Sequence, residues 1–103
     1  MQSNEPVEIR HSRLMAQVRT GVPAAKWMVE SKVPTTWPDS DLGLPSSGEH
    51  VYPGPIRGTR IALSHGSKRV IIHMGTVPHP YYPWRQARFA GEEIRITGSR
   101  LAL

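Results

Sequence analysis

Apolar side chains recur at nearly helical spacing within the first twenty residues. Four of them carry the pattern: Val7, Leu14, Met15 and Val18. Glutamates near the start and an arginine near the end suit the helix dipole. We therefore expect a helix from about Glu5 to Thr20, with Asn4 as its N-cap and Gly21 just beyond its end.

The pattern changes after Gly21. Pro23 is typical of the first position of a helix, where the missing N–H costs no hydrogen bond, and a second short helix is expected from there through Val29. It must end before Val33, because Pro34 disfavours the helical conformation of its predecessor. Five prolines and four glycines then follow between Pro34 and Gly58. This density predicts a long irregular arm over residues 34–58, of the kind that is usually functional, disordered or laid on a partner.

The clearest strand pattern runs from Thr59 to Gly75. Ile61 and Leu63 alternate with more polar residues, and a four-residue turn containing Gly66 follows. The next run, residues 69–74, is apolar on both faces. The pattern predicts a β-hairpin whose second strand lies in the middle of a sheet.

Two further strands are indicated near the C-terminus. Residues from Glu92 to Thr97 alternate again, with Ile94 and Ile96 inward. Gly98 and the serine after it then predict a turn into a short last strand, residues 100–103.

Together these elements predict an α+β fold. It has one or two N-terminal helices, a long irregular Pro/Gly-rich arm, and a small antiparallel sheet of three or four strands covered by the first helix. The alternative is a small, mostly β, barrel-like domain in which the N-terminal segment is extended. A chain of 103 residues suits one core, so we expect a single domain over 1–103. Its parts are a helical segment 1–33, the arm 34–58 and a basic β-rich segment 59–103.

Composition narrows the class of protein. The chain has no cysteine, which excludes disulfides, thiolate metal sites and cysteine nucleophiles. Its first twenty residues hold no continuous apolar stretch, so no secretory leader is expected, and no apolar run approaches the length of a membrane span. We expect a cytoplasmic protein, or one held within a particle or assembly.

The net charge of +5 is unevenly distributed. Up to Val51 there are five basic residues against six acids, and from Tyr52 onward eight against two. No acid occurs between Glu49 and Glu92, a span that holds six cations: Arg57, Arg60, Lys68, Arg69, Arg85 and Arg88. The basic half is therefore predicted to meet an anionic partner.

An aromatic and basic segment lies within this span. Arginine binds phosphate bidentately and aromatic rings stack on bases, so the segment favours a nucleic-acid surface. The predicted nucleic-acid or anion-binding residues are Arg57, Arg60, Lys68, Arg69, Tyr81, Tyr82, Trp84, Arg85 and Arg88. In the alternative interpretation, Trp84, Phe89 and one tyrosine close the core while the arginines are solvated.

Metal and catalytic motifs are weak. None of the five histidines (His11, His50, His65, His73 and His79) pair at the spacing of a helical zinc motif. Asp39 and Asp41 resemble the start of a calcium loop, but Gly43 displaces a ligand and His50 stands at the twelfth position, so a capped turn explains them better. No metal and no cofactor is expected. The remaining catalytic hypothesis is a metal-independent ribonuclease that uses His73 and His79 among nearby arginines.

The sequence therefore favours a noncatalytic basic binding or assembly subunit that docks on an anionic surface, within a nucleoprotein or virion-type assembly. Its expected partner is a nucleic acid, a nucleoprotein or a larger protein assembly, and not a membrane. Two alternatives stay open: a protein–protein inhibitory or assembly module without nucleic-acid contact, and the small ribonuclease.

Overall fold

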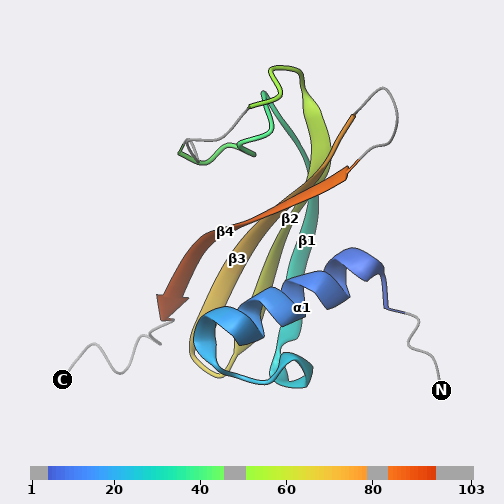
Figure 1. The fold of residues 1–103 in the computed structure, drawn as a ribbon. Helices are drawn as coiled ribbons and strands as arrows, with labels where there is room; N and C mark the ends of the chain where they lie inside the picture. Colours follow the sequence, from blue (N-terminus) through green and yellow to red (C-terminus); the bar gives the residue numbers. More distant parts are fainter. Residues whose placement is uncertain (1–4, 46–50, 79–83, 95–103) are drawn as a thin grey trace.

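The computed structural model describes residues 5–45, 51–78 and 84–94 (Figure 1). Within these ranges the elements are α1 (Val7–Thr20), the 3₁₀ turn η1 (Ala24–Lys26), β1 (Met28–Trp37), β2 (Ile56–His65), β3 (Lys68–Val77) and β4 (Trp84–Ile94). The strands pair antiparallel in the order β1-β2-β3-β4, and α1 crosses one face of the sheet (Figure 1). The predicted α+β class is confirmed. The sheet is open, so the barrel-like alternative is wrong.

Helix α1 begins two residues later than expected. Its N-cap is Pro6, whose carbonyl accepts the N–H groups of Ile9 and Arg10 at 3.1 and 3.2 Å. No side chain caps this end, and the expected cap, Asn4, lies outside the described residues. At the other end Gly21 adopts φ +82° and donates its N–H to the carbonyl of Gln17, as a C-terminal glycine does.

The second helix and the long arm are the two main corrections. Only the three residues of η1 are helical, and the chain enters β1 at Met28. Pro34 lies inside β1 because this is an edge strand, where a residue without an N–H is tolerated. The predicted arm 34–58 is too long at both ends, since β1 continues to Trp37 and β2 starts at Ile56. The described residues between these strands, 38–45 and 51–55, are irregular and are together named the connection 38–55.

The predicted hairpin is confirmed and extends further than expected. β2 and β3 pair with Ile61 opposite Ile72 and Leu63 opposite Val70. Gly66 has φ +61° at the first turn position and the next residue does not, a pattern typical of a type II′ turn. β3 is a central strand, buried on both faces along most of its length.

The strand expected at 92–97 is the end of a longer one. β4 starts at Trp84, so the part of the basic and aromatic segment from Trp84 onward belongs to the sheet. Its pairing with β3 is interrupted once, by a bulge between Phe89 and Gly91. The predicted last strand, 100–103, lies outside the described residues.

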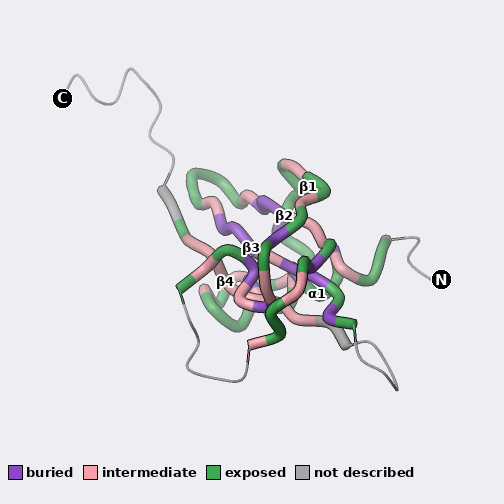
Figure 2. Tube along the Cα trace, turned by 90° about the horizontal axis from the view of Figure 1, so that it is seen from above, coloured by how far each residue is buried: buried purple, intermediate pink, exposed green. Residues whose placement is uncertain are grey.

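Two groups of buried residues stabilise the two faces of the sheet. On the α1 side the helix-side core contains Ile9, Ala16, Trp27, Ile61, Leu63, Val70, Ile72 and Met74. On the opposite face a smaller loop-side core contains Trp37, Leu42, Ile56 and Val77. The buried positions follow the middle strands when the molecule is viewed from above (Figure 2). Leu42 of the connection packs in the loop-side core, at one end of the face that α1 leaves open.

Candidate docking surface

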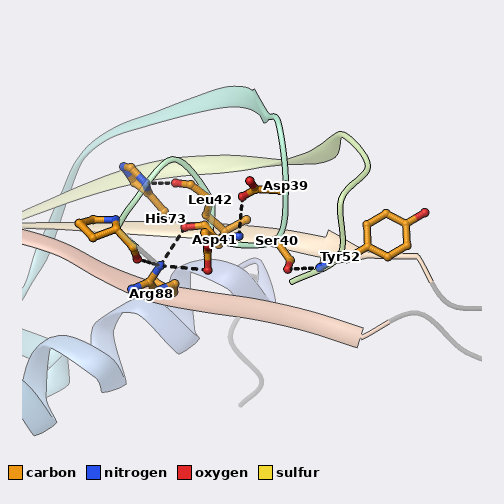
Figure 3. Close-up of polar contacts among 8 residues, drawn as sticks. Asp39, Ser40, Asp41, Leu42, Tyr52, His73 and Arg88 are labelled. Carbon is orange, nitrogen blue, oxygen red and sulfur yellow. Dashed lines mark hydrogen bonds and ion pairs between the residues drawn. The ribbon is translucent and has the colours of Figure 1, made fainter. Parts of the chain in front are cut away.

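The described residues of the connection 38–55 are held by hydrogen bonds among themselves and to the sheet (Figure 3). Ser40 donates its N–H to the carbonyl of Tyr52, and the Tyr52 N–H donates to the Ser40 hydroxyl at 2.8 Å. Asp39 accepts the N–H of Asp41 through its carboxylate, which confirms the predicted capped turn. Leu42, completely buried in the loop-side core, adopts φ +57° in this turn.

His73 belongs to this packing. Its ring stacks on Trp37 with 4.9 Å between ring centroids. Its Nδ1 lies 2.8 Å from the carbonyl oxygen of Leu42 (Figure 3). The Nδ1 atom therefore donates to a backbone carbonyl and is not available for proton transfer. His79, the other histidine of the ribonuclease hypothesis, lies outside the described residues.

Arg88 fixes the same connection from β4. Its guanidinium donates to the carbonyls of Asp41 and Pro45 at 3.0 and 2.8 Å, and it lies 3.7 Å from the Asp41 carboxylate (Figure 3). In the register of the sheet, Arg60, His73 and Arg88 occupy neighbouring positions on β2, β3 and β4. This row lies on the sheet face opposite α1. Two of its three members are engaged within the chain.

The other predicted basic residues with described side chains lie at different positions along β2 and β3. Arg69 forms an ion pair with Glu30 at 2.7 Å, and the bulge that sets Glu30 outside the pairing of β1 directs it toward β3. Arg57 is exposed at the start of β2, Arg60 is half-buried in its middle, and Lys68 is exposed beside the hairpin turn. These three cations have no acidic partner in the ranges that the structure describes.

The remaining predicted residues are only partly placed. Trp84 and Arg85 belong to the first residues of β4, and Tyr81 and Tyr82 lie outside the described residues. Phe89 is half-buried at the edge of the helix-side core, beneath the guanidinium of Arg19, whose carbon is 4.7 Å from the ring centroid. Phe89 therefore contacts the core, as the alternative interpretation of this residue predicted.

An apolar groove beside Phe89 was not predicted. It lies between α1 and β4, has a volume of about 670 Å³, and opens to solvent. Its lining residues are His11, Leu14, Met15, Val18, Arg19 and Phe89. Leu14 is 46% and Val18 87% exposed, which is unusual for two apolar side chains on the same face of one helix.

The groove exists because α1 has two apolar faces. Ile9 and Ala16 are buried against the sheet, whereas Val7, Leu14 and Val18, three of the residues whose spacing predicts the helix, face solvent. A helix with a polar outer face would have left no such groove. The sequence could have indicated this groove, because α1 contains more apolar residues than one buried helix face can hold.

The described ranges do not meet the requirements of a metal-ligand cluster or of a membrane-spanning helix. No cluster of three or more potential metal ligands occurs there. None of the helices in those ranges combines the length and the apolar character needed to cross a membrane.

These features define a small α+β domain, which in its described residues has one helix on an open antiparallel sheet of four strands and an apolar groove at the edge of its helical side. The chain belongs to the family described as a domain of unknown function, DUF8738, whose profile matches residues 9–82. The match covers most of α1 and the sheet through β3. No curated protein and no solved structure matches the chain significantly.

Proposed function

We propose that the protein is a noncatalytic binding and assembly subunit that docks on another protein through the groove between α1 and β4. The observation that carries the proposal is the exposure of Leu14 and Val18 beside the ring of Phe89. Burying exposed apolar side chains is the main favourable contribution to protein association, at about 25 cal/mol per Å² of apolar surface. An apolar groove with a charged rim is a common form of protein-binding surface.

The charges around the groove favour a protein partner over a nucleic acid. Among the residues that line the groove, Arg19 is the arginine, and its guanidinium lies over the Phe89 ring. His11 also lines the groove. Two arginines of the acid-free span, Arg69 and Arg88, are neutralised by acids of this same chain. Phosphate binding needs several cations directed at one backbone, and these two contribute little to such a surface.

An anionic partner is a second candidate, because one observation supports it. Arg57, Arg60 and Lys68 have no ion-pair partner among the described residues. A nucleic acid that contacted them would bind in a strongly salt-dependent manner. The two candidates therefore differ in their response to salt.

The test is affinity purification from the native source with the tagged wild type and two matched variants. Val18→Lys places a charge in the groove, and Val33→Lys places the same charge at an exposed valine on β1. The purification is carried out after nuclease treatment and at about 1 M salt, where charges are screened beyond about 3 Å. We expect defined proteins to be retained by the wild type and by Val33→Lys and to be lost with Val18→Lys.

Equal retention by all three proteins would contradict the groove as the docking surface. Capture that disappears with nuclease or at about 1 M salt in the wild type would instead support the nucleic-acid candidate.

A further inference from the structure

The solvent side of α1 carries a largely apolar stripe along its length. This outer stripe consists of Val7, His11, Leu14 and Val18, which are separated by four, three and four positions. Residues at this spacing lie along one line of a helix, and the same spacing is used where one helix packs along another. The three apolar side chains are 39%, 46% and 87% exposed, and His11 is exposed as well. α1 therefore presents the pattern of a helix–helix contact to solvent.

The groove extends the outer stripe toward β4. His11, Leu14 and Val18 belong to both, and Phe89 forms the wall that β4 contributes. A helix is about 10–12 Å across, so one that lies on the stripe can also contact the opposite wall of the groove. An amphipathic helix that lays its apolar side into such a groove is a common form of protein recognition. The shape of the surface therefore favours a helical partner.

The acids of α1 do not balance its exposed cations. Glu5 lies 3.1 Å from the guanidinium of Arg13, and Glu8 lies 2.9 Å from the ammonium group of Lys32. Both carboxylates are therefore already neutralised by basic residues of the same chain.

The exposed charges beside the outer stripe are mainly basic. Arg10 flanks the stripe on one side, and Arg19 lies on the other side, in the lining of the groove. Both side chains are exposed, and no ion pair joins either of them to an acid of the described residues. Glu92, which the register of β4 places on the same face of the sheet, is exposed but does not line the groove. Two arginines against one acid leave this surface with a positive charge.

We infer that the partner that docks on this surface is an amphipathic helix whose apolar stripe is flanked by acidic residues. This inference rests on the proposed function and names the chemistry of its partner. The apolar side chains supply the affinity, and the partner's carboxylates pair with Arg10 and Arg19 and so select it among other amphipathic helices. A second copy of α1 is the weaker candidate. It would double the number of exposed arginines at the contact, while its own glutamates are already paired.

The test is the binding of two synthetic peptides to the full chain, measured by fluorescence anisotropy at about 0.1 M salt. Both peptides are helices of equal length with leucine at the a and d positions of each heptad. One carries glutamate at the flanking e and g positions, and the other carries lysine there. We expect the glutamate peptide to bind on the order of tenfold more tightly than the lysine peptide. Leu14→Gln, which removes apolar surface from the stripe without a change of charge, should weaken the binding of both peptides.

A pair of charge reversals locates the preference on the surface. Arg10→Glu should weaken the binding of the glutamate peptide and strengthen that of the lysine peptide. A gain for the lysine peptide also shows that the variant is folded. Arg57→Glu makes the same change in net charge at an exposed residue of β2 outside the stripe and the groove lining, and it should leave the preference unchanged.

Several results would overturn the inference. They are equal binding of the two peptides, tighter binding of the lysine peptide, binding of neither, binding that Leu14→Gln does not weaken, and a preference that Arg10→Glu does not alter. A wild type that sediments as a dimer and becomes monomeric with Leu14→Gln would also overturn it, because a second copy would then occupy the stripe.

These outcomes are separate from those of the proposed function. If Val18→Lys abolishes protein capture from the native source while the two peptides bind equally, only the acidic character of the partner helix is refuted. If the glutamate peptide is preferred as expected while capture is unaffected by Val18→Lys, only the docking of the native partner through the groove is refuted.

Discussion

At the scale of single residues, Arg88 was predicted to bind an anionic partner, but in the structure it contacts its own chain. Its guanidinium donates to two backbone carbonyls of the connection 38–55 and approaches the Asp41 carboxylate. Asp41 is 47 residues earlier in the chain. The absence of acids between Glu49 and Glu92 therefore says nothing about neutralisation, because the partners come from the other half of the sequence.

Replacing Arg88 should lower stability. Arg88→Met keeps the aliphatic part of the side chain and removes the hydrogen bonds to Asp41 and Pro45. We expect the free energy of unfolding to fall by about 1–3 kcal/mol, as for hydrogen bonds to charged groups. Arg57→Met, at an exposed arginine without such contacts, should change it by less than about 0.5 kcal/mol. Urea titration of both variants measures this, and equal midpoints would show that Arg88 does not hold the connection.

His73, a residue of the ribonuclease hypothesis, also contacts residues that are distant in the sequence. A histidine among arginines is compatible with ribonuclease chemistry, but in the structure its ring lies on Trp37 and its Nδ1 faces the carbonyl of Leu42. Neither contact has a signature in the sequence, since Trp37 and Leu42 reach His73 only through folding. The sequence shows which residue types are present, but it does not show which side chains surround them after folding.

At the scale of elements, local pattern decided what the sequence could predict. The β2–β3 hairpin was predictable because its alternation and its glycine turn are local signals. β1 was not, because most of its residues are exposed and its burial does not alternate, while Pro34 indicates an interruption. β4 was found only at its end, since its first half resembles a binding segment more than a strand.

A pair of facing glycines gives the sheet a testable weak point. Gly58 on β2 lies opposite Gly75 on β3. A Cβ atom at Gly58 would overlap the carbonyl oxygen of Met74 and lie 2.7 Å from the Cα of Gly75, and both of these are backbone atoms that cannot move alone. The central strands can therefore approach this closely only while position 58 has no side chain.

We expect Gly58→Ala to destabilise the protein by about 3 kcal/mol through overpacking. Gly91→Ala is the matched control on β4, because a Cβ there meets nothing within 4 Å and its φ is not positive. The control should be neutral or stabilise by up to about 1 kcal/mol. Thermal unfolding compares the two variants. A Gly58→Ala protein as stable as Gly91→Ala would contradict the observed β2–β3 pairing.

The described part of the connection, around Ser40 and Leu42, should be ordered in the isolated protein, although the prolines and glycines of the sequence suggest a loose arm. The Ser40 and Leu42 amides donate to carbonyl oxygens, and Leu42 is buried. We expect these amides to exchange with solvent at rates closer to those of the strands than to those of free peptide. Hydrogen exchange monitored by NMR measures this, and exchange at free-peptide rates would show that the connection is not docked.

At the scale of the whole molecule, the described part of the chain has α1 covering a sheet of four strands and leaves apolar surface beside β4. The predicted class was correct because strands and helix each have a local period. The sequence did not predict the apolar groove, because Leu14 and Val18 were used only as evidence for a helix, and their exposure depends on which face of α1 meets the sheet. The charge asymmetry of the sequence pointed to the basic half, while the folded chain neutralises part of it.

The central claim is that the groove between α1 and β4 contacts protein, and site-specific photo-crosslinking in the native source tests it most directly. A photoreactive amino acid is placed at Val18 in the groove and, as the matched control, at Val33 on β1, because both side chains are exposed. The account predicts discrete crosslinked protein products from position 18, to a second copy or to another protein, and none from position 33. Crosslinks from position 33 alone, or from neither position, would contradict it.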